Sequence, residues 1–145
     1  MMHSNITIKN NVISNMYNDG AIRVMNWKDC IISNNTITSI NNLSNPSKQS
    51  TSRAILLSGT NNVKITKNYI ANCGRAFQYI AWKNTGGGSS YPIIKDKLSS
   101  QNKSDLQNNW VVNLLSGEYF TRLTYVYNVY TNAEKISFSV GPYAE

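Results

Sequence analysis

The sequence is poor in the residues on which most catalytic and metal sites depend. It has one histidine, two cysteines and seven acidic residues, and charged residues make up only 14% of the 145 positions. The lone histidine, His3, lies beside the N-terminus, so the sequence offers neither a histidine-based triad nor a metal site. No phosphate-binding motif and no cofactor site are predicted.

Signals for membrane insertion, export and nucleic-acid binding are also missing. No apolar run approaches the length of a membrane span, and residues 1–5 are neither basic nor apolar enough for a signal peptide. The net charge of +7 is spread along the chain without a cluster of lysines and arginines. Such a diffuse positive charge suits an anionic cell-wall glycan or other polysaccharide better than a nucleic acid.

Asparagine and apolar residues are plentiful. The chain has 22 asparagines, and 41% of its residues are hydrophobic, which is enough for a packed core and argues against disorder. Solubility therefore comes mainly from amides and hydroxyls. The two cysteines, Cys30 and Cys73, fall at different positions of the repeat described next, and we expect both to be free thiols in the core.

One short pattern recurs three times before residue 84, about every two dozen residues with one insertion. Each copy is an alternating apolar segment followed by an asparagine: Ile6-Thr7-Ile8 with Asn11, Cys30-Ile31-Ile32 with Asn35, and Val63-Lys64-Ile65 with Asn68. A second alternating segment repeats in step at residues 21–24, 54–57 and 76–79. The polar, proline-containing insertion at residues 41–53 predicts a loop that protrudes from one corner.

Repeats of this length predict a solenoid, because each unit is too small to bury its own apolar face and must stack on its neighbours. The alternation within each unit is that of a strand with one buried face, and no useful helical periodicity is found. Asparagines at one position of every unit predict a stacked ladder of amides, formed by Asn11, Asn35 and Asn68. The pattern therefore favours an all-β chain that begins with a short right-handed parallel β-helix of about three coils.

The units N-I-T-I-K-N-N-V-I, C-I-I-S-N-N-T-I and V-K-I-T-K-N-Y-I resemble the pectate-lyase-like (pectin lyase-like) β-helix repeat family, over roughly residues 4–84. We accordingly expect residues 1–84 to form the β-helix coils. Residues 85–109 open with a Gly/Ser-rich run and predict a linker and an irregular segment. Residues 110–145 contain three strand-like runs and predict a C-terminal antiparallel β-meander that supports oligomerisation.

An aromatic and basic set is the main candidate for binding a glycan. Alignment of the second repeating segment puts Trp27, Thr60 and Trp82 at one position, with Lys28 and Lys83 directly after the tryptophans. If these residues stand in one column, the indoles form a platform for sugar faces and the lysines meet anionic groups. The alternative is that both indoles cover apolar surface at a corner of the fold.

Catalytic candidates are weak. Enzymes on β-helix folds need clustered carboxylates, often with a basic residue. Residues 1–84 offer only Asp19 and Asp29 as carboxylates, with Arg23, Arg53 and Arg75 as the arginines, and the weak catalytic candidates are Asp19, Asp29 and Arg23. Asp29 aligns with Asn62, and Asp19 lies in an Asn-Asp-Gly turn, so structural roles are favoured for both. The sequence leaves enzymatic activity open and predicts no metal.

A short β-helix followed by a tyrosine-rich β-region resembles the distal part of a bacteriophage tailspike or tail-fibre protein. The resemblance implies a homotrimer in the virion tail or at an extracellular surface, with receptor binding through host polysaccharide. A fragment of a polysaccharide lyase, hydrolase or epimerase is the first alternative, and a purely structural connector is the second.

Apolar surface in the repeats predicts assembly. The first coil would expose Ile6, Ile8 and Val12, and alternation places Leu56 on the outside of its strand. The run at residues 119–130 also suggests assembly, because it carries apolar or aromatic residues on both faces. We expect a homo-oligomer, most simply a trimer, or stacking on further β-helix coils, and we expect the chain to be the C-terminal piece of a longer protein.

Overall fold

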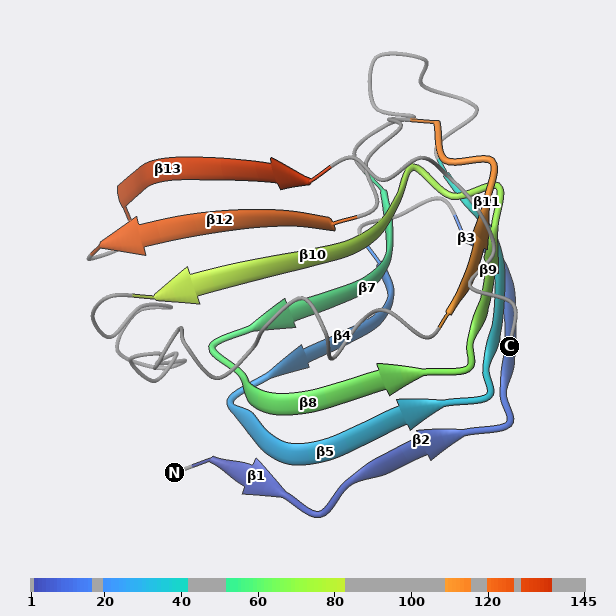
Figure 1. Ribbon diagram of the computed structural model, residues 1–145, viewed down its shortest axis with the longest axis horizontal. Coiled ribbons are helices and arrows are strands. Elements are labelled where there is room, and N and C mark those ends of the chain that lie inside the picture. Colours follow the sequence, from blue (N-terminus) through green and yellow to red (C-terminus); the bar gives the residue numbers. More distant parts are fainter. Residues whose placement is uncertain are drawn as a thin grey trace.

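The computed structural model describes residues 2–16, 20–41, 52–82, 109–115, 120–126 and 129–136, and these residues form an all-β structure without a helix. Their strands build three sheets in which all pairs but one are parallel (Figure 1). Residues 42–51 of the predicted corner loop (residues 41–53) and residues 85–108 of the predicted linker (residues 85–109) lie outside the described residues.

The three sheets are named here in the order in which the chain reaches them. Sheet 1 contains β1 (His3–Ser4), β2 (Thr7–Lys9), β5 (Trp27–Ser33) and β8 (Asn61–Thr66). Sheet 2 contains β3 (Val12–Met16), β6 (Thr36–Ile40), β9 (Tyr69–Ala71) and β11 (Trp110–Val112). Sheet 3 contains β4 (Gly20–Met25), β7 (Arg53–Ser58), β10 (Arg75–Trp82), β12 (Phe120–Val126) and β13 (Val129–Ile136).

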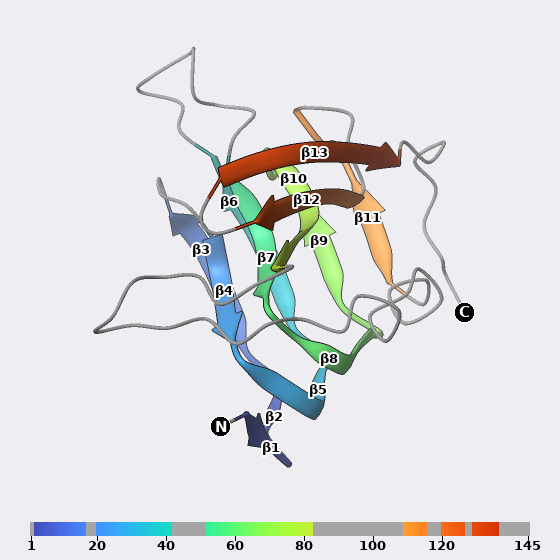
Figure 2. The same ribbon diagram turned by 90° about the vertical axis from the view of Figure 1, so that its left-hand side faces the viewer.

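The chain visits the sheets in a fixed cycle. One circuit is β2, β3 and β4, the next is β5, β6 and β7, and a third is β8, β9 and β10. Each circuit lies on the previous one with its strands parallel, so the view in Figure 2 shows β3 at one end of the stack and β11 at the other. Residues at the same position of the repeat therefore face one another across neighbouring strands.

The core is built from these in-register columns of apolar side chains. Ile8, Ile32 and Ile65 form one column in sheet 1, and Ile22, Ile55 and Phe77 form another in sheet 3. The residues beyond the first circuit are buried almost completely. Ile32, Ile55 and Phe77 have a paired strand on each side, whereas β8, which carries Ile65, pairs with β5 alone among the described strands. Each such side chain contributes roughly 1.5–3 kcal/mol relative to exposure, so stacking stabilises circuits that could not fold alone.

The C-terminal strands differ from the expected antiparallel meander. β11 pairs parallel with β9, and β12 pairs parallel with β10, so both continue the sheets of the earlier circuits. Only β12 and β13 are antiparallel among the described strands. The meander prediction is wrong because the run at residues 110–112 repeats the pattern of 69–71 and places Val111 in the same fully buried column as Ile70.

Corners between strands, and bends within β3, β5, β6 and β8, use a left-handed backbone conformation at repeated positions. Twelve described residues have φ between 52° and 61°, and the strand registers align them in four columns. The columns are Asn5, Asp29 and Asn62; Asn10, Asn34 and Lys67; Asn15, Ser39, Asn72 and Asn113; and Asn26 with Gly59. Asn tolerates this conformation better than most residues, which explains much of the asparagine content.

Leu56 is not on the surface. It lies between Arg23 and Gln78 in neighbouring strands, as its repeat position predicts, but its side chain is only 2% exposed. Ala54, Ser58 and Gln78 are buried as well. The expectation of an exposed Leu56 is therefore wrong, because alternation identifies the two faces of a strand and does not reveal whether one or both are covered.

Candidate functional site

The asparagines at the repeated position after sheet 1 form one column. Asn11 donates from both its backbone N–H and its Nδ2 to Asn35 Oδ1, each at 3.0 Å. Asn35 makes the same pair of bonds to Asn68 Oδ1, at 2.9 Å and 3.0 Å. Each side chain thereby holds two backbones together, and the ladder fixes the corner that separates sheet 1 from sheet 2.

A fourth rung, Asn109, was not predicted. Asn68 donates to Asn109 Oδ1 from its backbone N–H at 3.1 Å and from its Nδ2 at 2.9 Å. Asn109 is fully buried and in turn donates to the carbonyl of Ile65 at 2.8 Å. The signal was in the sequence, since residues 109–113 (Asn-Trp-Val-Val-Asn) match residues 68–72 (Asn-Tyr-Ile-Ala-Asn).

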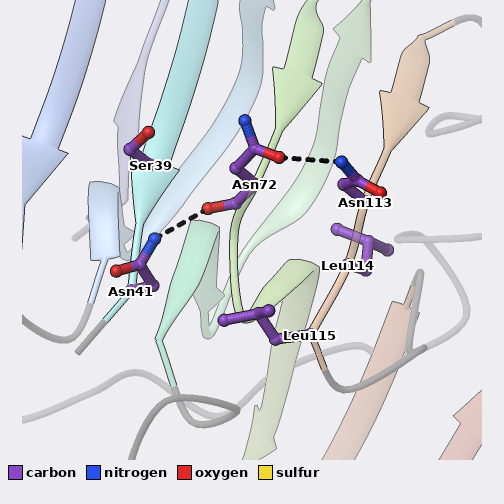
Figure 3. A pocket seen from close by; sticks show the side chains of 6 residues that line it. All are labelled: Ser39, Asn41, Asn72, Asn113, Leu114 and Leu115. Carbon is purple, nitrogen blue, oxygen red and sulfur yellow. Dashed lines mark hydrogen bonds between the residues drawn. The ribbon is translucent and has the colours of Figure 1, made fainter. Parts of the chain in front are cut away.

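A pocket of about 460 Å³ lies at the next corner, where the chain leaves sheet 2 for sheet 3. Six residues line it: Ser39, Asn41, Asn72, Asn113, Leu114 and Leu115. None of the six is ionisable. In Figure 3 the three asparagine side chains stand in a row, with Ser39 on one side of the row and the leucines on the other.

The strand register builds this pocket. Ser39, Asn72 and Asn113 belong to one left-handed column, with φ of 60°, 56° and 54°, so each occupies the same place at the end of its strand. Asn113 Nδ2 donates to Asn72 Oδ1 at 3.0 Å, and Asn41 Nδ2 donates to the Asn72 carbonyl, also at 3.0 Å. The amides are thus pre-oriented by bonds among themselves.

Each amide in the row keeps hydrogen-bonding capacity. Within the part of the chain that the structure describes, no partner is found for Asn72 Nδ2, Asn41 Oδ1 or Asn113 Oδ1. Leu115, which is 49% exposed, adds an apolar wall, and its N–H donates to the Cys73 carbonyl at 2.9 Å. Donors, acceptors and apolar surface together suit an uncharged polar ligand rather than acid–base chemistry.

The structure does not bring the predicted aromatic platform together. Trp27 is half-buried, packs against the core and begins β5 in sheet 1, whereas Trp82 ends β10 in sheet 3, opposite Tyr125. Thr60 is fully buried and cannot reach a ligand outside. The column fails because β7 ends at Ser58, where the chain turns into sheet 1, while β10 continues straight to Trp82.

The lysines of that platform have no shared position either. Lys28 is exposed on β5, opposite Asn61 of β8. Lys83 lies outside the described residues. Lys28 is therefore an exposed cation that directly follows Trp27 on β5, with no second lysine of the predicted set beside it among the described residues.

The two weak catalytic candidates that the structure describes, Asp29 and Arg23, lie in different sheets. Asp29 is an exposed corner residue with φ of 52° that accepts a hydrogen bond from Asn62 Nδ2 at 2.8 Å. Arg23 lies on β4 in another sheet, and Asp19 lies outside the described residues. No group of three or more His, Cys, Asp or Glu that could hold a metal occurs within the described ranges.

Both cysteines are free and buried, which confirms the prediction. Burial raises the pKa of the Cys73 thiol to about 11. Its Sγ approaches the carbonyls of Ala71 and Ile37, at 3.3 Å and 3.9 Å. Cys73 directly follows Asn72, but its thiol faces the core and takes no part in the pocket.

No described helix is long and apolar enough to cross a membrane. Comparisons of the chain with family models, with curated proteins and with solved structures found no match.

Proposed function

We propose that the chain is a short right-handed parallel β-helix that binds surface polysaccharide, as part of a tailspike- or tail-fibre-like protein. Three features support the fold: the cyclic visits to three parallel sheets, the in-register apolar columns and the asparagine ladder. A stack of this kind has long continuous sides, which suit an extended polymer.

The observation that carries the binding function is the composition of the corner pocket. Its lining consists of three amides, one hydroxyl and two leucines. Sugar hydroxyls both donate and accept hydrogen bonds, and sugar rings present apolar faces, so a carbohydrate matches both parts of the lining. The volume of about 460 Å³ also lies in the usual range for small-ligand sites.

Binding to purified surface polysaccharides, neutral and anionic, tests this function by calorimetry. We expect Asn72→Ala to weaken binding about 2- to 10-fold, the effect of losing one hydrogen bond to a neutral group. Asn62→Ala is the matched control, because Asn62 has a similar φ of 53° at a corner away from the pocket. Equal affinities for the two variants, or no polysaccharide binding by the native chain, would overturn the proposal.

The same samples separate the alternatives. Release of unsaturated sugars or new reducing ends from a bound polysaccharide would favour a lyase or hydrolase. A folded chain that binds no polysaccharide would favour a structural connector. Turnover that survives Asn72→Ala would place any reaction away from the pocket.

We further propose that the chain assembles as a homotrimer or stacks on further β-helix coils. The first circuit supports this, since β2, β3 and β4 are edge strands of their sheets and Val12 is 78% exposed. Leu56 is buried and therefore no longer supports assembly. The side chains of residues 119–130, which also suggested assembly, lie outside the described residues. Light scattering from nanomolar to micromolar concentration tests it, and a stable monomer throughout would rule assembly out.

A further inference from the structure

An exposed aromatic pair lies on the outer face of sheet 2. Tyr69 begins β9 and Trp110 begins β11, and the two residues are directly opposite each other in the parallel register. They are 41% and 40% exposed, and their ring centroids are 6.4 Å apart with the planes tilted by 37°. The residues that follow them, Ile70 and Val111, are fully buried, so the two rings are on the outside.

The pair is not required by the core. The inward column of sheet 2 is already filled, and neither Tyr69 nor Trp110 belongs to the buried cluster or packs on it. Two neighbouring aromatic rings left half-exposed mark a surface that gains from contact with a partner. Rings tilted by 37° form a shallow platform rather than a deep groove, so a flat apolar face fits them best.

The same two strands lead from the aromatic pair to the pocket. β9 continues from Tyr69 through Ala71 to Asn72, and β11 continues from Trp110 through Val112 to Asn113. At about 3.3 Å per residue, the amides lie roughly 10 Å beyond the rings, close to the length of a disaccharide. Between the rings and the amides, alternation places two short residues on this side of the sheet: Ala71, which is 3% exposed, and Val112, which is half-buried.

We infer that β9 and β11 form one extended oligosaccharide site, with an amide end in the pocket and a stacking end at Tyr69 and Trp110. This inference rests on the proposed function and adds the direction and length of the ligand. At least three sugar units bind along the strands, the terminal one hydrogen-bonded to Asn72 and Asn113 and a later one stacked on the rings. The ligand chemistry is a run of pyranoses with free hydroxyls and a flat apolar face.

Length dependence of binding tests the inference. The probes are size-graded fragments, from two to six sugar units, of a polysaccharide that the native chain binds. We expect affinity to rise about tenfold between two and four units, as stacking is added to the pocket contacts. Trp110→Ala should abolish that rise while leaving the affinity for the two-unit fragment within about twofold, and Trp110→Phe should restore part of it.

Two comparisons distinguish the possible failures. Asn72→Ala should weaken fragments of every length by the same factor, because its contact is made by the first unit. Ile31→Ala, which removes an exposed apolar residue of sheet 1, controls for a general loss of surface and should change nothing. Far-UV circular dichroism verifies that each variant is folded.

A polysaccharide that binds in an Asn72-dependent way, with the rise unchanged in Trp110→Ala, overturns this inference and leaves the proposed function standing. Absence of any binding overturns both. A change in the light-scattering mass on Trp110→Ala, without a change in sugar affinity, would assign the aromatic pair to a protein contact instead and would also overturn the inference.

Discussion

Replacement of the second ladder residue, Asn35→Ala, should destabilise the chain strongly. The Asn35 side chain is 1% exposed and takes part in four hydrogen bonds. Its Oδ1 accepts the backbone N–H and the Nδ2 of Asn11, and its Nδ2 donates to the Ile8 carbonyl at 3.1 Å and to Asn68 Oδ1 at 3.0 Å. Alanine removes all four bonds at once.

The loss in unfolding free energy can be estimated from the hydrogen bonds that alanine removes and those that its neighbours keep. A net hydrogen bond contributes about 0.5–1.5 kcal/mol, so four set an upper range of roughly 2–6 kcal/mol. Three of the four involve the partly exposed first circuit, where water can replace the lost partner. Asn68 Oδ1 also keeps its bond from the Asn35 backbone N–H at 2.9 Å. The expected loss is therefore about 2–3 kcal/mol, or roughly 6–10 °C in Tm.

Urea unfolding followed by far-UV circular dichroism measures this loss, with unchanged m-values as the sign that the same surface unfolds. Asn11→Ala is the matched control. Asn11 is the exposed end rung, and its side chain makes two bonds, to Asn35 Oδ1 and to the Lys9 carbonyl. It should cost less than about 1 kcal/mol. If Asn35→Ala destabilises no more than Asn11→Ala, the ladder contributes nothing through its buried position and the reasoning is refuted.

Two further predictions concern the corners and the core. Lys67 occupies a left-handed position (φ 58°) whose column is otherwise Asn10 and Asn34, so Lys67→Asn should raise stability by roughly 0.5–1 kcal/mol, and a lower urea midpoint would contradict the strain argument. Burial raises the pKa of the Cys73 thiol to about 11 in the folded chain, against 9.0 for an unperturbed thiol, so the free energy of unfolding should fall as the pH rises from about 9 to about 11. Cys73→Ala should lack this extra pH dependence, and identical profiles for the two proteins would show that burial does not perturb the thiol.

The repeat made the inward face of each circuit predictable. Positions with period-two alternation, such as Val63 and Ile65, are fully buried and stand in register with Cys30 and Ile32. An asparagine at a fixed distance after such a segment lies in the ladder each time. These features are local, because the strand period and the circuit length decide them before any contact between distant segments forms.

Features that depend on what lies outside a strand were not predictable in this way. Leu56 was expected at the surface and is buried, because no pattern within β7 reveals what packs on its outer face. Trp82 and Trp27 have the same offset from the start of their repeating segments in the sequence. The offset does not show whether the chain turns into the next sheet, as it does before Trp27, or continues in the same strand, as β10 does to Trp82. The pocket and the Tyr69–Trp110 pair both require β11, whose place beside β9 depends on a pairing between residues far apart in the chain.

The direction of the asparagine ladder gives the stack two unlike ends. In each described rung the amide donors belong to the earlier circuit and the acceptor to the later one, so the first circuit presents the Asn11 Oδ1 as an acceptor with no donor among the described residues. Two copies that met through their first circuits would oppose acceptor to acceptor. A circuit running in the same direction would instead supply donors. At the opposite edge of sheet 3, the last described strand, β13, runs antiparallel to β12 and so departs from the parallel order of the circuits. The two ends of the described stack therefore differ in hydrogen-bonding polarity, and a neighbour matched to the amide acceptor at the first circuit would not match the other end.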